Sequence, residues 1–384
     1  MKKRNNKIQD LITAGAMTVI VLAVLIWNHA NPVDSRIYES DSLNYYKGHV
    51  TGVAEESLTA RDNEGARRLG YQKLEVHIDQ GTLKGRKLTI DNDVTNTHHI
   101  ICRKGTRVIV KVDGSPGVKL FYNIYNYDRT LGRILLVGVF AVLLLAVAGH
   151  KGLRSLLGLA FAMVMILGFL LPALFHGYSP AGVTFITVTV IIVSAMTLLN
   201  GWSRKTWVAV AATVLGMAVA SAVYVVFSGI MHVNGYNLEA AEELILIRQK
   251  SGLSVSGLLF VSIAVSSLGA LIDIAMSVVS VLFEIWEQKP DIRSDELFRS
   301  GMNIGRDLAG ANCQTLILAF TGSVITTLMV IISYGYQFNQ MINADFISIE
   351  LLGGMTAAIA VILTVPFSAL LTALAVRWSR RVFG

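Results

Sequence analysis

Eight long apolar runs constrain this chain more than any other feature of its sequence. Each run has roughly the 20 mostly apolar residues that a helix needs to cross a bilayer. Only 15% of the 384 residues are charged, against roughly 25% in a typical soluble domain. The sequence therefore predicts a membrane protein, an all-α bundle of about eight transmembrane helices. The predicted helices cover residues 11–29, 132–149, 153–175, 180–199, 206–231, 254–284, 309–334 and 351–376.

Basic residues gather at the ends of these runs, so the formal net charge of +7 favours topology anchors over binding of nucleic acid. Five basic stretches fall on the same side of the membrane if every run crosses it: MKKRNNK, HKGLR, WSRK, the connection at 289–306 and WSRR. Because basic loops stay in the cytoplasm, we expect both termini there. The basic N-terminus and the first run (residues 1–30) are expected to form an uncleaved anchor, since no small-x-small cleavage site follows.

One large polar segment, residues 31–128, separates the first two runs and is predicted to be extracytoplasmic. Its stretches GHVTGVAEESL, YQKLEVHID, GRKLTIDND and GTRVIVKV alternate apolar with polar residues between turn residues. Four or five short strands in fewer than a hundred residues predict a small OB-like β-barrel inserted after the first helix. Residues 129–384 then form the polytopic domain with the other seven helices.

A polar stripe runs through the apolar run at 254–284. Steps of three and four residues from Asp273 stay on one face of a helix. A charged Asp at the bilayer centre costs about 2.5–3.5 kcal/mol on insertion scales, so such a residue is a functional candidate by default. We expect Asp273 to be a proton- or cation-coupling group; the alternative is a neutral Asp that makes a packing hydrogen bond. The stripe comprises Ser262, Ser266, Gly269, Asp273, Ser277, Ser280 and Glu284.

A second stripe follows in RSGMNIGRDLAGANCQTLILAFTGS. The connection at 287–302 is short enough for an antiparallel neighbour, and two helices with polar stripes are natural partners. We therefore expect the stripes to meet in a buried polar seam, with Asp307 nearer the membrane surface than Asp273. The second stripe comprises Asn303, Asp307, Gly310, Gln314 and Thr321, with Arg306 and Asn312 nearby.

The sequence offers little for catalysis. It has no nucleotide-binding G-x-x-x-x-G-K-[ST], no H-E-x-x-H and no G-x-S-x-G. An intramembrane aspartyl protease needs two facing carboxylates, and Asp273 and Asp307 are expected at different depths. Cys102 and Cys313 lie in unlike surroundings and lack metal-ligand spacing. We expect no enzyme, no cofactor and no metal site.

The stretches LLFVSIAVSSLGALIDIAMSVVSVLFEI and LFRSGMNIGRDLAGANCQTLILAFTGS resemble the YibE/F-like family of bacterial multi-pass membrane proteins. G-A-L-x-D-x-A-M-S and I-G-R-D carry the likeness, which covers most of residues 130–376. The resemblance implies a bacterial cell membrane. It also implies a heteromeric partner of the same family without the outer domain, with a homo-oligomer as the alternative. A weaker likeness, through Gly269-x-x-x-Asp273 and Glu284, is to RND and SecD/SecF-type proton-driven permeases, which have six spans and a larger outer domain.

Two functions remain open from the sequence. The first is a secondary transporter or permease component coupled through Asp273, with an unidentified substrate. The second is a membrane scaffold or sensor whose outer β domain binds an envelope component or a partner protein. Besides membrane lipids, the partners expected are proteins only. The residues predicted to serve coupling or transport are Ser266, Gly269, Asp273, Ser277, Ser280, Glu284, Asn303, Arg306, Asp307, Asn312 and Gln314.

Overall fold

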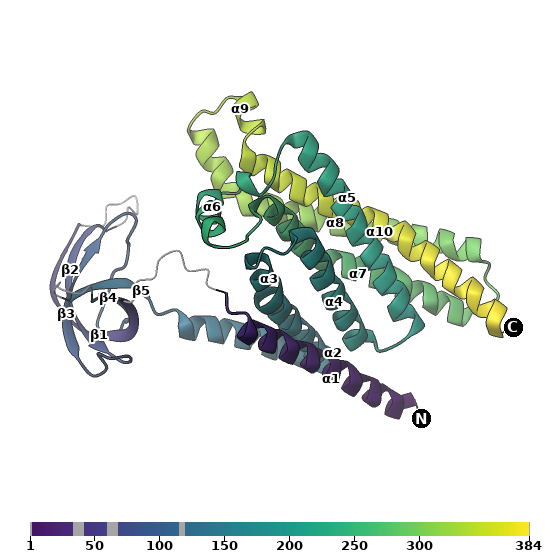
Figure 1. The fold of residues 1–384 in the computed structure, drawn as a ribbon, viewed down its shortest axis with the longest axis horizontal. Coiled ribbons are helices and arrows are strands. Elements are labelled where there is room, and N and C mark those ends of the chain that lie inside the picture. The colour runs from purple at the N-terminus through teal and green to yellow at the C-terminus, as the bar shows by residue number, and fades with distance from the viewer. Residues whose placement is uncertain (1, 34–41, 60–67, 115–119, 384) are drawn as a thin grey trace. The chain divides into compact units, whose positions relative to one another are not determined.

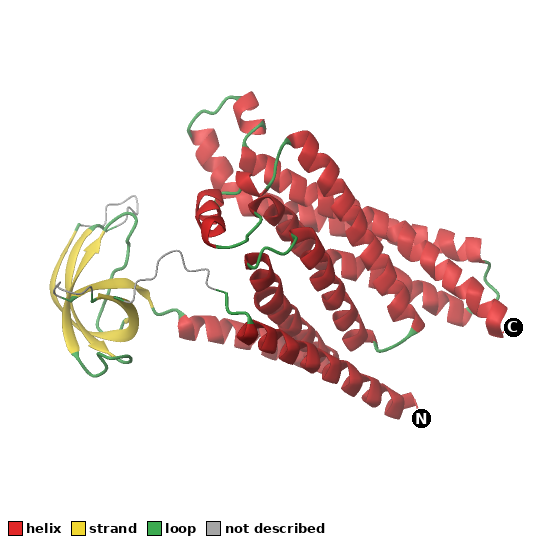
Figure 2. Cartoon of the chain, in the orientation of Figure 1, coloured by secondary structure: helices red, strands yellow, loops and turns green. Residues whose placement is uncertain are grey.

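The computed structural model describes residues 2–33, 42–59, 68–114 and 120–383 (Figure 1). Contacts divide the chain into two compact units, Tyr38–Leu144 on the one hand and Met1–Ile37 with Leu145–Gly384 on the other. Strands occur in the first unit only among these residues, and long helices dominate the second (Figure 2). Each unit is described by itself.

The smaller unit is built on one antiparallel sheet. Its strands are β1 (Leu43–Leu58), β2 (Gly70–Ile78), β3 (Lys87–Val94), β4 (Arg107–Asp113) and β5 (Phe121–Tyr127), in the order β3-β2-β1-β4-β5. The long β1 pairs with both β2 and β4. Register shifts in β1 between Val50 and Gly52 and between Val53 and Glu55 favour bending. The sheet curls until β3 and β5 approach each other, which makes a half-barrel that is compatible with the predicted small barrel.

One face of the curled sheet forms the core of this unit. Alternate residues of the strands are fully buried, as the two-residue period of a strand requires; they include Val50, Leu74, Val76, Val108, Val110 and Ile124. Two buried amides attach the connection between β3 and β4 to this core. Asn92 Nδ2 donates to Ile100 O at 2.7 Å, and Cys102 N donates to Gln72 Oε1 at 2.9 Å. Cys102 is thereby fully buried, and desolvation raises the pKa of its thiol to about 11.

The larger unit is helical, and α2 joins it to the sheet. The helical segments are α1 (Lys2–Ala30), α2 (Thr130–Met165), the π-helix η1 (Ile166–Leu170), α3 (Leu171–Phe175), α4 (Pro180–Asn200), α5 (Arg204–Met231), η2 (Gly235–Asn237), α6 (Ala241–Lys250), η3 (Val255–Gly257), α7 (Leu258–Gln288), α8 (Ser294–Ser333), α9 (Phe338–Ile342) and α10 (Asp345–Phe383).

Seven helices among the described residues are long and apolar enough to cross a membrane, where the sequence predicted eight. The predicted helices 132–149 and 153–175 fall within one run, Thr130–Phe175. The intervening residues hold no proline, and Gly149 alone is recorded with a non-helical backbone inside α2 (φ 54°, ψ −131°). A straight run of 46 residues would extend about 69 Å, more than twice the hydrocarbon thickness of about 30 Å. The break at Gly149 divides the run into two pieces, each long enough to span.

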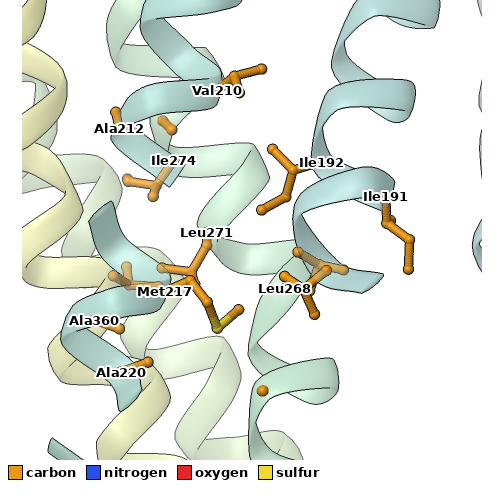
Figure 3. Packing of buried hydrophobic residues seen from close by; sticks show 14 of the residues in the cluster. Ile191, Ile192, Val210, Ala212, Met217, Ala220, Leu268, Leu271, Ile274 and Ala360 are labelled. Atoms are coloured by element: carbon orange, nitrogen blue, oxygen red, sulfur yellow. The ribbon is translucent and has the colours of Figure 1, made fainter. Parts of the chain in front are cut away.

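The bundle core lies between α4, α5, α7 and α10. Figure 3 shows Met217, Leu268 and Leu271 pointing toward one another between these helices. Helix α10 contributes small and hydroxyl side chains at every fourth position, and these are all buried: Thr356, Ala360, Thr364, Ser368 and Thr372. Small residues let membrane helices approach closely. At Gly216 of α5 the two helices approach so closely that a Cβ there would lie 2.1 Å from Thr364 Oγ1.

Helix α1 packs on the same bundle through polar contacts. Asn28 Nδ2 donates to Gly168 O at 2.6 Å, within the π-helical turn η1. In the first half of α1, Trp202 Nε1 donates to Thr13 Oγ1 at 2.8 Å. A π-helical turn departs from the regular hydrogen-bond pattern, so Asn28 supplies a donor where the ladder is irregular.

Candidate functional site

The polar stripe of α7 lies on the exposed side of the helix, on which the other helices of the chain do not pack. The buried side of α7 includes Leu271, Ile274 and Val278, which pack toward α5 and α10. Successive residues are turned by about 100° around the helix axis, so the Asp273 side chain points about 160° away from that of Leu271 around this axis. The other stripe residues share this outward side. Exposed are Ser262, Ser266, Gly269, Asp273, Ser277 and Glu284, and Ser280 is half-buried.

Asp273 lies fifteen residues from each end of α7, at its midpoint. Among the described residues, its carboxyl group has no hydrogen bond and no ion pair. The neighbouring hydroxyls bond within their own helix. Ser262 Oγ donates to Leu258 O at 3.2 Å, and Ser266 Oγ donates to Ile263 O at 3.1 Å. The carboxyl group is therefore available to water, an ion or another chain.

The polar stripe of α8 also points away from the bundle. Helix α8 packs on α10 through glycines: a Cβ on Gly301 would lie 2.7 Å from Ala369 Cβ, and one on Gly305 would lie 2.1 Å from Val365 Cγ1. This glycine side turns the opposite, polar side outward. Exposed there are Asn303, Arg306, Asp307, Gly310, Gln314 and Thr321, and Asn312 is half-buried.

The predicted buried seam between the two stripes is therefore wrong for this chain taken alone. Close packing of the small residues of α8 against α10 sets the rotation of α8, and its polar residues follow. Arg306 Nη1 lies 3.5 Å from Asn303 Oδ1, at the limit of a hydrogen bond. Asn312 Nδ2 donates to Leu308 O of its own helix at 2.9 Å. The described residues show no ion pair between Arg306 and Asp307.

The helix that carries Asp307 begins well before the predicted apolar run. Helix α8 begins at Ser294, fifteen residues before the predicted start at 309, because Ser294–Glu296 supply acidic residues that favour a helix N-terminus. Asp307 thus lies thirteen residues into α8, and Asp273 lies fifteen residues before the end of α7. No hydrogen bond joins the two carboxyl groups in the part of the chain that the structure describes.

The sequence analysis missed a further carboxyl group, Glu350, near the start of the long apolar helix α10. Ser323 Oγ of α8 donates to Glu350 Oε2 at 3.3 Å. Glu350 lines a small, mostly apolar cavity of about 170 Å³ between α8 and α10, together with Phe320 and Thr321. The sequence signal was present, since Glu350 directly precedes the run at 351–376 in ISIELL. The signal was overlooked because a carboxylate at the edge of an apolar run is also typical of the end of a membrane-spanning helix.

No three His, Cys, Asp or Glu side chains in the described residues are grouped as metal ligands. The site offered by the helices is therefore a polar surface that carries carboxylates, with Asp273 at the midpoint of α7 and Asp307 about a third of the way along α8.

The sequence of residues 136–378 matches the family described as YibE/F-like protein. Comparisons with curated proteins and with solved structures gave no match. The matched segment contains both polar stripes and most of the helical unit. Together with the seven long apolar helices, it indicates a membrane protein. The match covers well over half of the 384 residues, and the chain therefore belongs to the YibE/F-like family.

Proposed function

We propose that the chain is a component of a membrane transport system in which Asp273 is the proton- or cation-coupling carboxylate. One observation carries the proposal: a carboxyl group at the midpoint of a long apolar helix, on a continuous polar face and without a hydrogen bond or ion pair to any described residue. No enzymatic role is assigned to it.

The energetic argument concerns what covers this face in a bilayer. Ionisable residues in membrane helices almost always face a protein interior or a water-filled cavity, because exposure to lipid costs several kcal/mol. Serines and glycines on the same face permit close approach of another helix. The faces of α7 and α8 are thus suited to an assembly that encloses a polar path. The second subunit is a family member without an outer domain or another copy of this chain.

The proposed topology follows from the same physics. If each half of Thr130–Phe175 crosses the membrane, the chain has eight spans. The basic connections between the spans and both termini then lie in the cytoplasm. The β unit lies outside the cell membrane of a bacterium, where its half-barrel closes to an OB-like barrel or pairs with a partner.

A scaffold or sensor is the second candidate, supported by the presence of a compact β unit with its own core. A scaffold and a transporter differ in which part of the chain is essential for function. A scaffold keeps its function when Asp273 is changed to Asn and loses it when residues 40–125 are removed, whereas a transporter loses function with Asp273→Asn.

The experiment uses the full chain in liposomes that enclose a pH-sensitive dye. A potassium diffusion potential drives protons inward, and the dye reports the flux. We expect proton flux with the wild type, at least tenfold less with Asp273→Asn, and wild-type flux with Asp291→Asn, an exposed carboxylate in the connection after α7. If wild type conducts protons and Asp273→Asn conducts them equally, Asp273 is not the coupling group. Absence of proton flux in the wild type would remove proton coupling by this chain on its own.

A further inference from the structure

A charged pocket of about 470 Å³ opens at one end of the half-barrel. Four strands contribute to it. Lys47 and His49 belong to β1, Asp79 directly follows β2, Arg107 begins β4 and Asp128 directly follows β5. All these residues belong to the same compact unit, so the pocket is a property of the β unit alone.

Both carboxylates of the pocket already have cationic or hydrogen-bonding partners. Asp79 Oδ1 lies 2.9 Å from His49 Nδ1. Asp128 Oδ2 lies 3.5 Å from Lys47 Nζ, which also donates to Thr130 Oγ1 at 2.9 Å. Hydrogen bonds from Thr130 and the charge of Lys47 hold the pKa of Asp128 below its ordinary value. Asp128 thus stays ionised and keeps Lys47 in place.

Arg107 is the one cationic side chain of this pocket that no carboxylate contacts among the described residues. Its backbone oxygen accepts from Asp128 N at 2.9 Å, which fixes its position at the rim. Its guanidinium group has no hydrogen bond and no ion pair among the described residues. A free guanidinium offers up to five N–H donors in a planar fork that suits phosphate oxygens. The positive charges of Lys47 and Arg107 balance the negative charges of Asp79 and Asp128, but Asp79 pairs with His49 and Asp128 with Lys47, so no carboxylate is paired with the guanidinium of Arg107 in the described residues.

The pocket also adjoins the start of an apolar helix. Thr130, the residue that Lys47 contacts, is the first residue of α2 and of the candidate span Thr130–Phe175. A pocket at the end of a membrane-spanning helix lies at the level of the lipid headgroups, where phosphate is abundant.

We propose that this pocket binds a phosphate-bearing anion, with Arg107 as the principal ligand and Lys47 beside it. The phosphate belongs either to a lipid headgroup or to a soluble phosphate ester, since both present the same oxygens to the guanidinium. This site is independent of the role proposed for Asp273.

The test uses the full chain purified in a phosphate-free detergent. In one arm, inorganic phosphate and glycerol phosphate are titrated by calorimetry. In the other, native mass spectrometry counts bound dioleoyl phosphatidylglycerol, with dioleoylglycerol as the matching lipid without phosphate. Arg107→Gln is compared with Arg103→Gln, an exposed arginine of the same connection that does not line the pocket.

We expect Arg107→Gln to weaken binding about tenfold in one arm, from the loss of one charge-assisted interaction, and Arg103→Gln to leave it unchanged. A loss confined to the phospholipid arm identifies a headgroup site, and a loss in the calorimetric arm identifies a soluble ester. Equal binding by the two variants, or no phosphate-dependent binding by the wild type in either arm, overturns the proposal. The variants should unfold at the wild-type temperature, because neither side chain has a hydrogen bond or ion pair to the residues that the structure describes.

Discussion

Replacing Gly305 by Ala tests the packing that turns the polar side of α8 outward. The added Cβ would lie 2.1 Å from Val365 Cγ1 and 3.1 Å from two further atoms of the same side chain. Val365 is only 3% exposed, and β-branched side chains in helices have one strongly preferred rotamer. The side chain cannot move aside, so α8 must shift away from α10.

Gly310→Ala is the matched control on the same helix, because nothing lies within 4 Å of a Cβ at that position. Both variants gain the helix propensity of Ala over Gly, so this term cancels in the comparison. The remaining difference is the cost of overpacking, typically about 1–3 kcal/mol. We therefore expect Gly305→Ala to be less stable than Gly310→Ala by about that amount.

The assay is unfolding of the purified full chain in mixed micelles with increasing dodecyl sulfate, followed by circular dichroism and tryptophan fluorescence. Equal unfolding midpoints for the two variants would refute the packing of α8 on α10. A loss of stability with Gly310→Ala in reconstituted membranes, absent in detergent, would instead show that another chain covers the polar face.

Two further predictions concern stability. Asn28→Leu removes the hydrogen bond to Gly168 O and is expected to lower the free energy of unfolding by about 1 kcal/mol. The control is Asn31→Leu, which loses only a hydrogen bond to Trp27 O of α1 and is expected to change the free energy of unfolding less. Unfolding in mixed micelles measures both variants. Burial raises the pKa of Cys102 from 9.0 to about 11, so the folded state disfavours the thiolate. Its contribution is fully present below pH 9 and declines by about 2–3 kcal/mol as the pH rises to about 11. Denaturation at pH 8 and pH 11 should show a decline that is smaller by this amount in Cys102→Ala, and an equal decline in both proteins would contradict it.

Local patterns predicted much of the fold. The two-residue alternation in the segment 31–128 indicated the β unit, and apolar run lengths indicated the helices. The sequence did not predict how far the sheet closes, because curling depends on bulges such as those near Val50 and Val53, which leave no clear periodic signal. It also did not show that Gly149 interrupts a single run, since a lone glycine fits both a helix and a turn.

The candidate site was likewise predicted only in part from the sequence. Steps of three and four residues grouped Asp273 with Ser277 on one face, since this depends only on helix geometry. Which neighbour meets that face depends on shape complementarity between distant segments. The glycines of α8 fit against Val365 and Ala369 of α10, and no pattern within α8 alone specifies that fit. Glu350 was missed for a related reason, as its contact with Ser323 joins two helices.

Accessibility of the α7 face to water in a bilayer tests the central claim most directly. A cysteine is introduced by Ser277→Cys, one turn from Asp273, in a chain that also carries Cys102→Ala and Cys313→Ala. A charged, membrane-impermeant methanethiosulfonate is then applied to the reconstituted protein from both sides. Leu215→Cys, at an exposed apolar position near the middle of α5, is the lipid-facing control.

A polar transport path beside Asp273 predicts rapid modification with Ser277→Cys and none with Leu215→Cys. Resistance of the thiol in Ser277→Cys, equal to that of the control, would contradict a wet path and make the face of Asp273 a dry seam between subunits.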